Sequence, residues 1–191
     1  MHATFNDLER ARDQVSASSM GGAPFLISFG ATLFITALLS FYLPVNQAAL
    51  VAMFQGGVAL PIAFWLERRM GSGPMSHDNP LRPLSVQLAM SQVVALPAVI
   101  VAYSLNPATV PVVLAAIAGG HFLPYAWLQR TRVYVALAVA IAVGAFLIQI
   151  ALGTRAFPFV LFYMSLLYWS AAPFLYRNAA RLRGTIQAAA A

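Results

Sequence analysis

His121 is the one side chain, tyrosines apart, that can change its charge and yet lies well inside an apolar stretch of the sequence. It follows Gly119 and Gly120 and precedes Pro124, so its ring is expected where two helix backbones come close. Ionisable residues inside a membrane are candidates for function. A neutral histidine that donates one hydrogen bond between helices explains the same residue, and the sequence leaves both interpretations open.

The rest of the sequence offers little for catalysis. Cysteine is absent, which excludes thiolate chemistry and disulfides. Proton-coupled transporters of the usual kind use a membrane carboxylate, and the apolar stretches hold none. A hydrolase needs an activated nucleophile or a metal with several ligands; scattered serines such as Ser91 are a weak basis, and His77 and Asp78 have no further metal ligands near them. We therefore expect no enzyme activity, no metal and no cofactor.

Two apolar segments repeat the same spacing of glycine, proline and aromatic residues. GGVALPIAFW, residues 56–65, aligns without gaps to GGHFLPYAWL, residues 119–128, and the turn prolines Pro44 and Pro107 keep the same offset. A fainter match, SAAPFLY, places Pro173 near the end of the last apolar stretch. Each segment follows a short turn, so the chain is predicted to contain three copies of one helical hairpin, related by a parallel pseudo-threefold repeat.

The repeated residues have a physical consequence for the helix backbone. A diglycine lets a neighbouring helix approach closely, and a proline removes a backbone hydrogen bond and frees the carbonyl four residues before it. An unpaired carbonyl in hydrocarbon costs several kcal/mol, so each must face protein, water or a ligand. Four such carbonyls are expected at similar depth, those of Gly57, Val93, Gly120 and Trp169. The residues assigned to kinks and packing are Gly56, Gly57, Pro61, Pro97, Gly119, Gly120, Pro124 and Pro173.

Polar side chains near the same depth predict a candidate ligand site made of His121, Gln92, Gln55, Tyr163 and Tyr168. Because no charge lies in the apolar stretches, the expected ligand is a small neutral, weakly polar or lipid-like molecule that is bound or translocated there. In the alternative interpretation, neighbouring side chains satisfy the carbonyls, and the protein is a non-transporting membrane protein that acts through helix association with a protein partner or with lipid.

Composition decides the class of protein. Of 191 residues, 61% are hydrophobic and 8% are charged, whereas soluble domains are roughly half apolar and about a quarter charged. Stretches of roughly 20 apolar residues cross a bilayer as helices. The predicted fold is therefore an all-α, polytopic membrane bundle of six transmembrane helices, over residues 24–43, 47–66, 84–105, 109–128, 133–152 and 157–176.

The charged residues predict the orientation. All 11 basic residues are arginines, and only Arg155 lies in a turn on the opposite side of the predicted bundle from the others. Positive residues stay on the cytoplasmic side, so both termini are expected there. The net charge of +6 is thus a matter of topology, and no nucleic acid is expected; the expected partners are the lipid bilayer and, for a homo-oligomer, a second copy of the chain.

Three segments follow from this topology. Residues 1–20 are expected to form a cytoplasmic N-terminal arm, 21–178 the six-helix transmembrane domain, and 179–191 a cytoplasmic tail. In the arm, Leu8, Ala11 and Val15 have helical spacing, which is typical of a short helix lying on the membrane surface. The loop MGSGPMSHDNP is rich in glycine, serine and proline and is predicted to be a flexible linker.

The sequence also resembles a known family. GGHFLPYAW in the fourth stretch, FQGG in the second and NPL in the loop between the second and third are similar to an uncharacterised family of small multi-spanning bacterial membrane proteins. The likeness covers most residues from about Gly56 onward. It implies a location in the bacterial cytoplasmic (inner) membrane, and it carries no established activity, substrate or catalytic residue to this chain.

Overall fold

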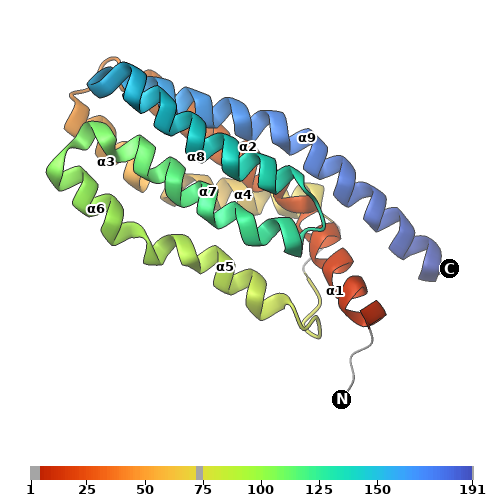
Figure 1. The fold of residues 1–191 in the computed structure, drawn as a ribbon. Coiled ribbons are helices and arrows are strands. Elements are labelled where there is room, and N and C mark those ends of the chain that lie inside the picture. The colour runs from red at the N-terminus through yellow and green to blue at the C-terminus, as the bar shows by residue number, and fades with distance from the viewer. Residues whose placement is uncertain (1–4, 72–74, 191) are drawn as a thin grey trace.

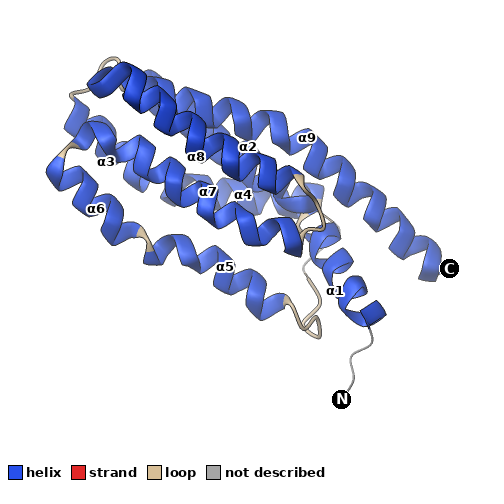
Figure 2. Ribbon diagram, in the orientation of Figure 1, coloured by secondary structure: helices blue, strands red, loops and turns tan. Residues whose placement is uncertain are grey.

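In a computed structural model, which describes residues 5–71 and 75–190, all regular secondary structure of these residues is helical (Figure 2). The prediction of an all-α fold is confirmed. The elements are α1 (Phe5–Ser18), η1 (Met20–Gly22), α2 (Ala23–Leu39), α3 (Val45–Phe54), α4 (Gly56–Met70), α5 (Arg82–Val94), α6 (Leu96–Leu105), η2 (Pro107–Thr109), α7 (Val110–Leu128), α8 (Val133–Leu152), η3 (Gly153–Arg155) and α9 (Ala156–Ala190).

Five helical stretches are long and apolar enough to cross a membrane, which fits a multi-pass membrane protein. The last of them, Val133–Ile186, contains both α8 and α9. Gly153 has a φ of +56° between these two helices, and they run side by side in opposite directions (Figure 1). The helix α1 and the end of α9 lie at the same end of the bundle, which we term the α1 end (Figure 1).

The core lies where α2 and α9 pack along each other and α7 packs along α8. Large apolar side chains from these four helices fill it, among them Leu33, Val110, Ile141 and Leu161, each almost fully buried. Around the outside, many large apolar side chains are exposed, as expected for a surface that faces lipid. The α5 and α6 helices lie at the edge of the bundle (Figure 1), and no residue of α5 is buried.

The prolines interrupt the helices less than the sequence predicts. Pro97 does separate two helices, since α5 ends at Val94 and α6 begins at Leu96. Pro61 lies inside α4, and the break in the second stretch falls at Gln55 instead, directly before Gly56 and Gly57. Glycine is a poor helix former, but the equivalent pair in α7, Gly119 and Gly120, does not break its helix. The α7 and α9 helices run without a break through their prolines.

Only one glycine of the repeated pairs lies very close to the backbone of another helix. A Cβ atom added to Gly119 would lie 2.8 Å from the Ala138 carbonyl oxygen of α8, whereas Gly57 and Gly120 have nothing within 4 Å. Gly56 would make only an ordinary contact with Phe29. Neighbouring residues on a helix point about 100° apart, so one diglycine cannot place both glycines against the same partner. The structure thus places Gly119 in close contact with α8, and the other three glycines have no comparably close neighbour.

The N-terminal helix packs on protein rather than presenting its apolar face outward. Ala11 and Val15 of α1 are buried in a small cluster with Leu81 and Leu128. The expected helix is therefore present, but its apolar face covers the α1 end of the bundle, because the ends of α5 and α7 offer apolar side chains there. The predicted linker is also partly ordered: residues 72–74 lie outside the described residues, but Asn79 is buried.

Candidate functional site

His121 lies on α7 and faces α5. Its Nδ1 atom is 3.1 Å from the Ser91 Oγ atom, and its ring centroid is 5.0 Å from that of Tyr125. The Ser91 hydroxyl donates its hydrogen to the Leu88 carbonyl oxygen at 2.7 Å, so the Ser91 oxygen is left to accept from Nδ1–H. In a neutral imidazole the other nitrogen, Nε2, then carries a free lone pair, and it has no hydrogen-bond partner among the described residues. The His121 ring is thus set up to accept a hydrogen bond.

Aromatic rings surround this histidine on the side of the core. The ring centroid of Phe122 lies 5.9 Å from that of His121, 5.5 Å from that of Tyr134 and 5.6 Å from that of Tyr168. The Tyr134 hydroxyl donates to the Gly21 carbonyl oxygen at 2.6 Å. Tyr168, one of the predicted ligand residues, is therefore connected to His121 through Phe122, within a packed aromatic cluster.

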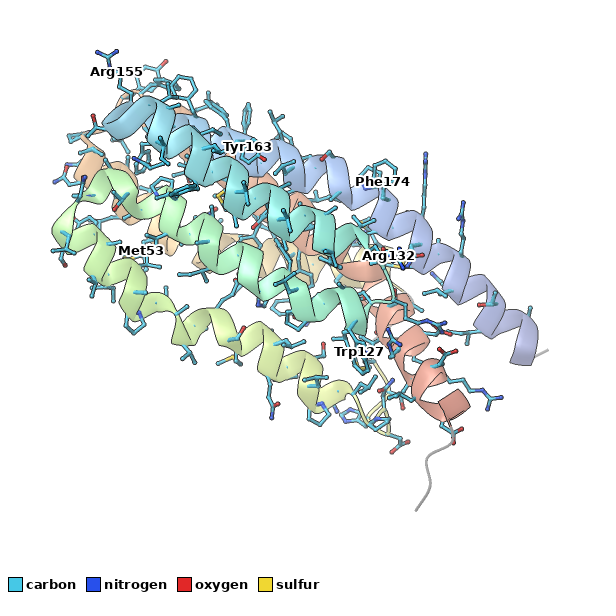
Figure 3. All side chains as sticks on the ribbon, viewed as in Figure 1. Met53, Trp127, Arg132, Arg155, Tyr163 and Phe174 are labelled. Atoms are coloured by element: carbon cyan, nitrogen blue, oxygen red, sulfur yellow. The ribbon has the colours of Figure 1, made fainter. Side chains whose placement is uncertain are left out.

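The other predicted ligand residues lie elsewhere. Gln92 is half-buried on α5, and its neighbour Ser91 bonds to His121 in its place. Gln55 lies at the α3–α4 break, where its side-chain oxygen is buried and has no hydrogen-bond partner among residues 5–71 and 75–190. Tyr163 on α9 donates to the Ala140 carbonyl oxygen of α8 at 2.7 Å (Figure 3). The five side chains therefore do not form a single cluster.

Inside the bundle, several polar side chains bond to the backbone of a neighbouring helix. Ser165 donates to the Gly30 carbonyl oxygen at 2.8 Å, and the Trp169 indole donates to that of Ile27 at 3.2 Å. Ser28 donates to the Ala59 carbonyl oxygen at 2.7 Å. These carbonyls are not the four expected from the prolines. Two of the donors, Ser165 and Trp169, are four residues apart in the sequence, a spacing that places both on one face of a helix.

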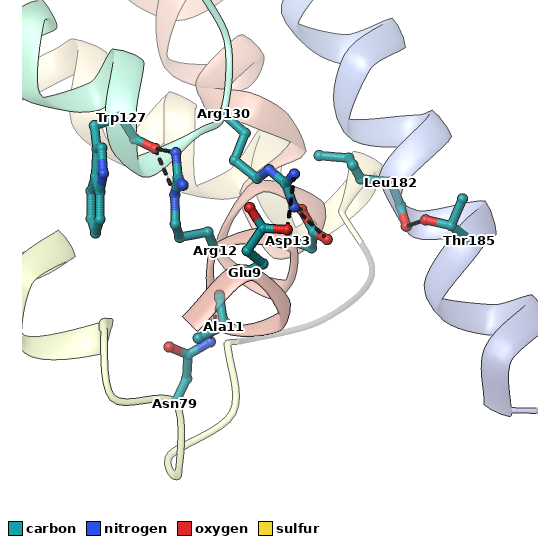
Figure 4. Close-up of polar contacts among 9 residues, drawn as sticks. All are labelled: Glu9, Ala11, Arg12, Asp13, Asn79, Trp127, Arg130, Leu182 and Thr185. Atoms are coloured by element: carbon teal, nitrogen blue, oxygen red, sulfur yellow. Dashed lines mark hydrogen bonds and ion pairs between the residues drawn. The ribbon is translucent and has the colours of Figure 1, made fainter. Parts of the chain in front are cut away.

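A second polar site lies at the α1 end, where Arg12 meets the last turn of α7 (Figure 4). The Arg12 Nε atom donates to the Trp127 carbonyl oxygen at 2.9 Å, its Nη2 atom donates to the same oxygen, and its guanidinium lies 4.5 Å from the centre of the Trp127 ring. Burial and the neighbouring Arg130 charge lower the pKa of Arg12 from its ordinary value. The carbonyls of a last helical turn lack partners within the helix, so Arg12 caps α7.

Two further contacts fix α1 at this site. Arg130 donates to both carboxylate oxygens of Asp13, at 2.9 and 3.1 Å, and lies 3.5 Å from the Glu9 carboxylate. Asn79, at the start of the NPL motif, donates to the Ala11 carbonyl oxygen at 2.9 Å and to the Gln14 side chain at 3.1 Å. No pattern in the sequence pointed to this site, because Arg12, Asn79 and Trp127 are far apart in the chain.

The model of a family of unknown function, DUF7010, matches residues 8–178. The chain belongs to this family. The DUF7010 match includes His121 and Ser91 as well as Arg12, Asn79 and Trp127, so both polar sites lie inside the region that defines the family. The expectation of an uncharacterised family is confirmed. No curated protein and no solved structure matches the chain.

Proposed function

We propose that this DUF7010 protein crosses the bacterial cytoplasmic membrane six times as three hairpins, with both termini in the cytoplasm. The reversal between α8 and α9 supports two crossings for the stretch Val133–Ile186, in addition to four for the other stretches. Arg132 lies at the α1 end and Arg155 at the opposite end of the bundle (Figure 3). All arginines except Arg155 belong to segments at or beyond the α1 end, which supports a cytoplasmic location for that end.

We further propose that the protein is not an enzyme and binds a neutral, weakly polar amphiphile at the junction between α5 and α7. The observation that carries this proposal is the Ser91–His121 bond, because it leaves His121 Nε2 free to accept a hydrogen bond from a hydroxyl group. A fatty alcohol or a neutral lipid with a hydroxyl head would supply such a donor.

The location of the junction favours entry from the lipid. No residue of α5 is buried, and its side chains Val86, Met90, Val93 and Val94 are more than half exposed. An acyl chain would find apolar contacts along this helix. The packed core supports a peripheral site over a central passage, since Leu33, Ile141 and Leu161 leave little room between the main helices.

Binding can be tested with a fatty alcohol that carries a photoactivatable diazirine group. We expect this probe to label wild-type protein in lipid nanodiscs at α5 and α7, and an unlabelled fatty alcohol to compete with it. The variants His121→Ala and Ser91→Ala each remove or misplace one hydrogen bond to the ligand. The concentration of unlabelled fatty alcohol that halves their labelling should therefore be about two- to tenfold higher than for the wild type. The effect of Gln92→Ala should be smaller, because the described hydrogen bond to the histidine involves Ser91 and not Gln92.

Ser170→Ala is the matched control, since the Ser170 hydroxyl is exposed and bonds to the Leu167 carbonyl oxygen of its own helix. It should bind the probe as the wild type does. If the unlabelled fatty alcohol halves the labelling of His121→Ala and Ser91→Ala at the same concentration as for the wild type, the proposed site is wrong.

One observation favours a second candidate, association with another helix as in a homo-oligomer. Gly57 and Gly120 are exposed, and each has open space within 4 Å, as an interface of small residues requires before its partner arrives. In that case Gly57→Leu or Gly120→Leu should abolish assembly in crosslinking experiments while leaving labelling by the probe unchanged. Unchanged assembly in both variants would exclude this candidate.

A further inference from the structure

The helix α5 is held to the rest of the protein at few points. Along its length, Ser91 bonds to His121. At its beginning, Leu84 and Leu88 pack on the buried cluster at the α1 end. Of the four buried residues of that cluster, Ala11 and Val15 come from α1. The position of α5 against α7 therefore depends on the N-terminal helix.

The polar contacts of α1 reach both sides of the same junction. Arg12 bonds to the Trp127 carbonyl oxygen at the end of α7, and Asn79, three residues before α5 begins, bonds to the Ala11 carbonyl oxygen (Figure 4). Through these two bonds α1 connects the beginning of α5 to the end of α7. The ion pair between Arg130 and Asp13 adds a contact to the turn that follows α7.

The polar contacts of α1 have the character of a reversible interaction. Its ion pair is partly exposed, and water can replace such interactions at small cost. The Ser16 hydroxyl and the Gln129 side-chain oxygen are buried in this region, and neither has a hydrogen-bond partner in the part of the chain that the structure describes. Buried polar atoms of this kind are destabilising. Release of α1 would expose these atoms to water and remove that cost.

The chain also provides a fixed pivot for α1. Met20, Gly21 and Gly22 have φ values of +51°, +64° and +81°, which ends α1 and turns the chain sharply into α2. The Tyr134 hydroxyl holds the Gly21 carbonyl oxygen, and Gly21 lies against the backbone of Leu175. The turn is thus attached to the bundle, and a movement of α1 about it leaves α2 in place.

We infer that α1 is a latch: in its docked position it clamps the beginning of α5 onto α7, and its release lets α5 move away from His121. The consequence for ligand binding rests on the proposed function: the docked latch restricts ligand access to His121, and the released latch opens the site. The latch itself concerns only the position of α5 and can be tested without any ligand.

The absence of cysteine allows spin labels to be placed at chosen positions. We would label Val86→Cys on α5 and Val135→Cys on α8, both exposed, and measure the distance between the labels in nanodiscs by double electron–electron resonance. The doubly labelled protein with an otherwise unaltered sequence should give one narrow distance distribution. Arg12→Ala should add a second population at longer distance, because α1 no longer holds the end of α7.

Arg10→Ala is the matched control, since Arg10 is an exposed arginine on the same helix, and it should leave the distribution narrow. Asn79→Ala provides an independent test from the other side of the junction and should add the same second population. Each variant is compared only as the monodisperse peak from size-exclusion chromatography, so that misfolded protein is excluded.

A narrow, wild-type distribution in both Arg12→Ala and Asn79→Ala would overturn the latch, as would an equal broadening in Arg10→Ala. Because no ligand is present, either result leaves the His121 labelling experiment unaffected. Conversely, a movement of α5 without any labelling by the fatty alcohol would support the latch and contradict the proposed function.

Discussion

Gly119→Leu is expected to prevent stable folding in the membrane, whereas the same change at the adjacent Gly120 should be tolerated. At Gly119, even a Cβ atom would lie 2.8 Å from the Ala138 carbonyl oxygen and 3.0 Å from the Ala142 Cβ atom. The larger leucine would force α7 away from α8, the helix with which α7 makes its most extensive contact. Overpacking of this kind costs about 1–3 kcal/mol and occasionally more.

The pair of variants provides its own control, because residue type and helix are the same. We expect Gly120→Leu to give a wild-type yield and thermal midpoint in detergent, since Gly120 has nothing within 4 Å. Gly119→Leu should give little monodisperse protein or a clearly lower midpoint. Equal midpoints for the two variants would show that the α7–α8 contact is not as described.

Gly21→Ala should produce the second large effect, a loss of about 2 kcal/mol or more in folding free energy. The φ of +64° at Gly21 costs an L-residue roughly 1–2 kcal/mol. In addition, the new Cβ atom would lie 2.8 Å from the Leu175 carbonyl oxygen, so the turn or α9 must shift. The shift would also weaken the hydrogen bond from the Tyr134 hydroxyl to the Gly21 carbonyl oxygen.

The same replacement at Gly57 should act in the opposite direction. Gly57 lies inside α4 with open space around it, and alanine in a helix is favoured over glycine by roughly 0.5–1 kcal/mol. Unfolding in increasing concentrations of sodium dodecyl sulfate compares the two variants with the wild type. If Gly21→Ala unfolds at the wild-type concentration, the turn does not have the conformation described.

The helices could be predicted from the sequence because length and hydropathy are sufficient for a membrane helix. The predicted stretch 133–152 coincides with α8. The sequence could not predict which face of each helix packs inward, because these helices are apolar all round and lack the polar stripe that marks a solvent face. That is why Gly119 and Gly120, or Ser91 and Gln92, could not be told apart.

His121 was identifiable from its residue type, whereas its surroundings were not. The bond to Ser91 depends on how α5 rests against α7, which no local pattern determines. The site at the α1 end could not be predicted for a related reason. Arg12 and Trp127 are 115 residues apart, and the repeated segment that contains Trp127 gives no indication of a contact with Arg12. Proline and glycine spacing does not by itself determine where a helix breaks. The second stretch is interrupted at Gln55, whereas α7, which carries the same diglycine and proline, is continuous.

The topology is tested most directly by labelling single cysteines in this cysteine-free chain with a membrane-impermeant maleimide. We would place them at Arg10 in α1, at Thr154 in η3 and at Thr185 near the end of α9. Six crossings with both termini inside predict that intact bacterial cells label only Thr154→Cys, and that Arg10→Cys and Thr185→Cys react only after permeabilisation. Labelling of Arg10→Cys and Thr185→Cys from opposite sides of the membrane would contradict the account.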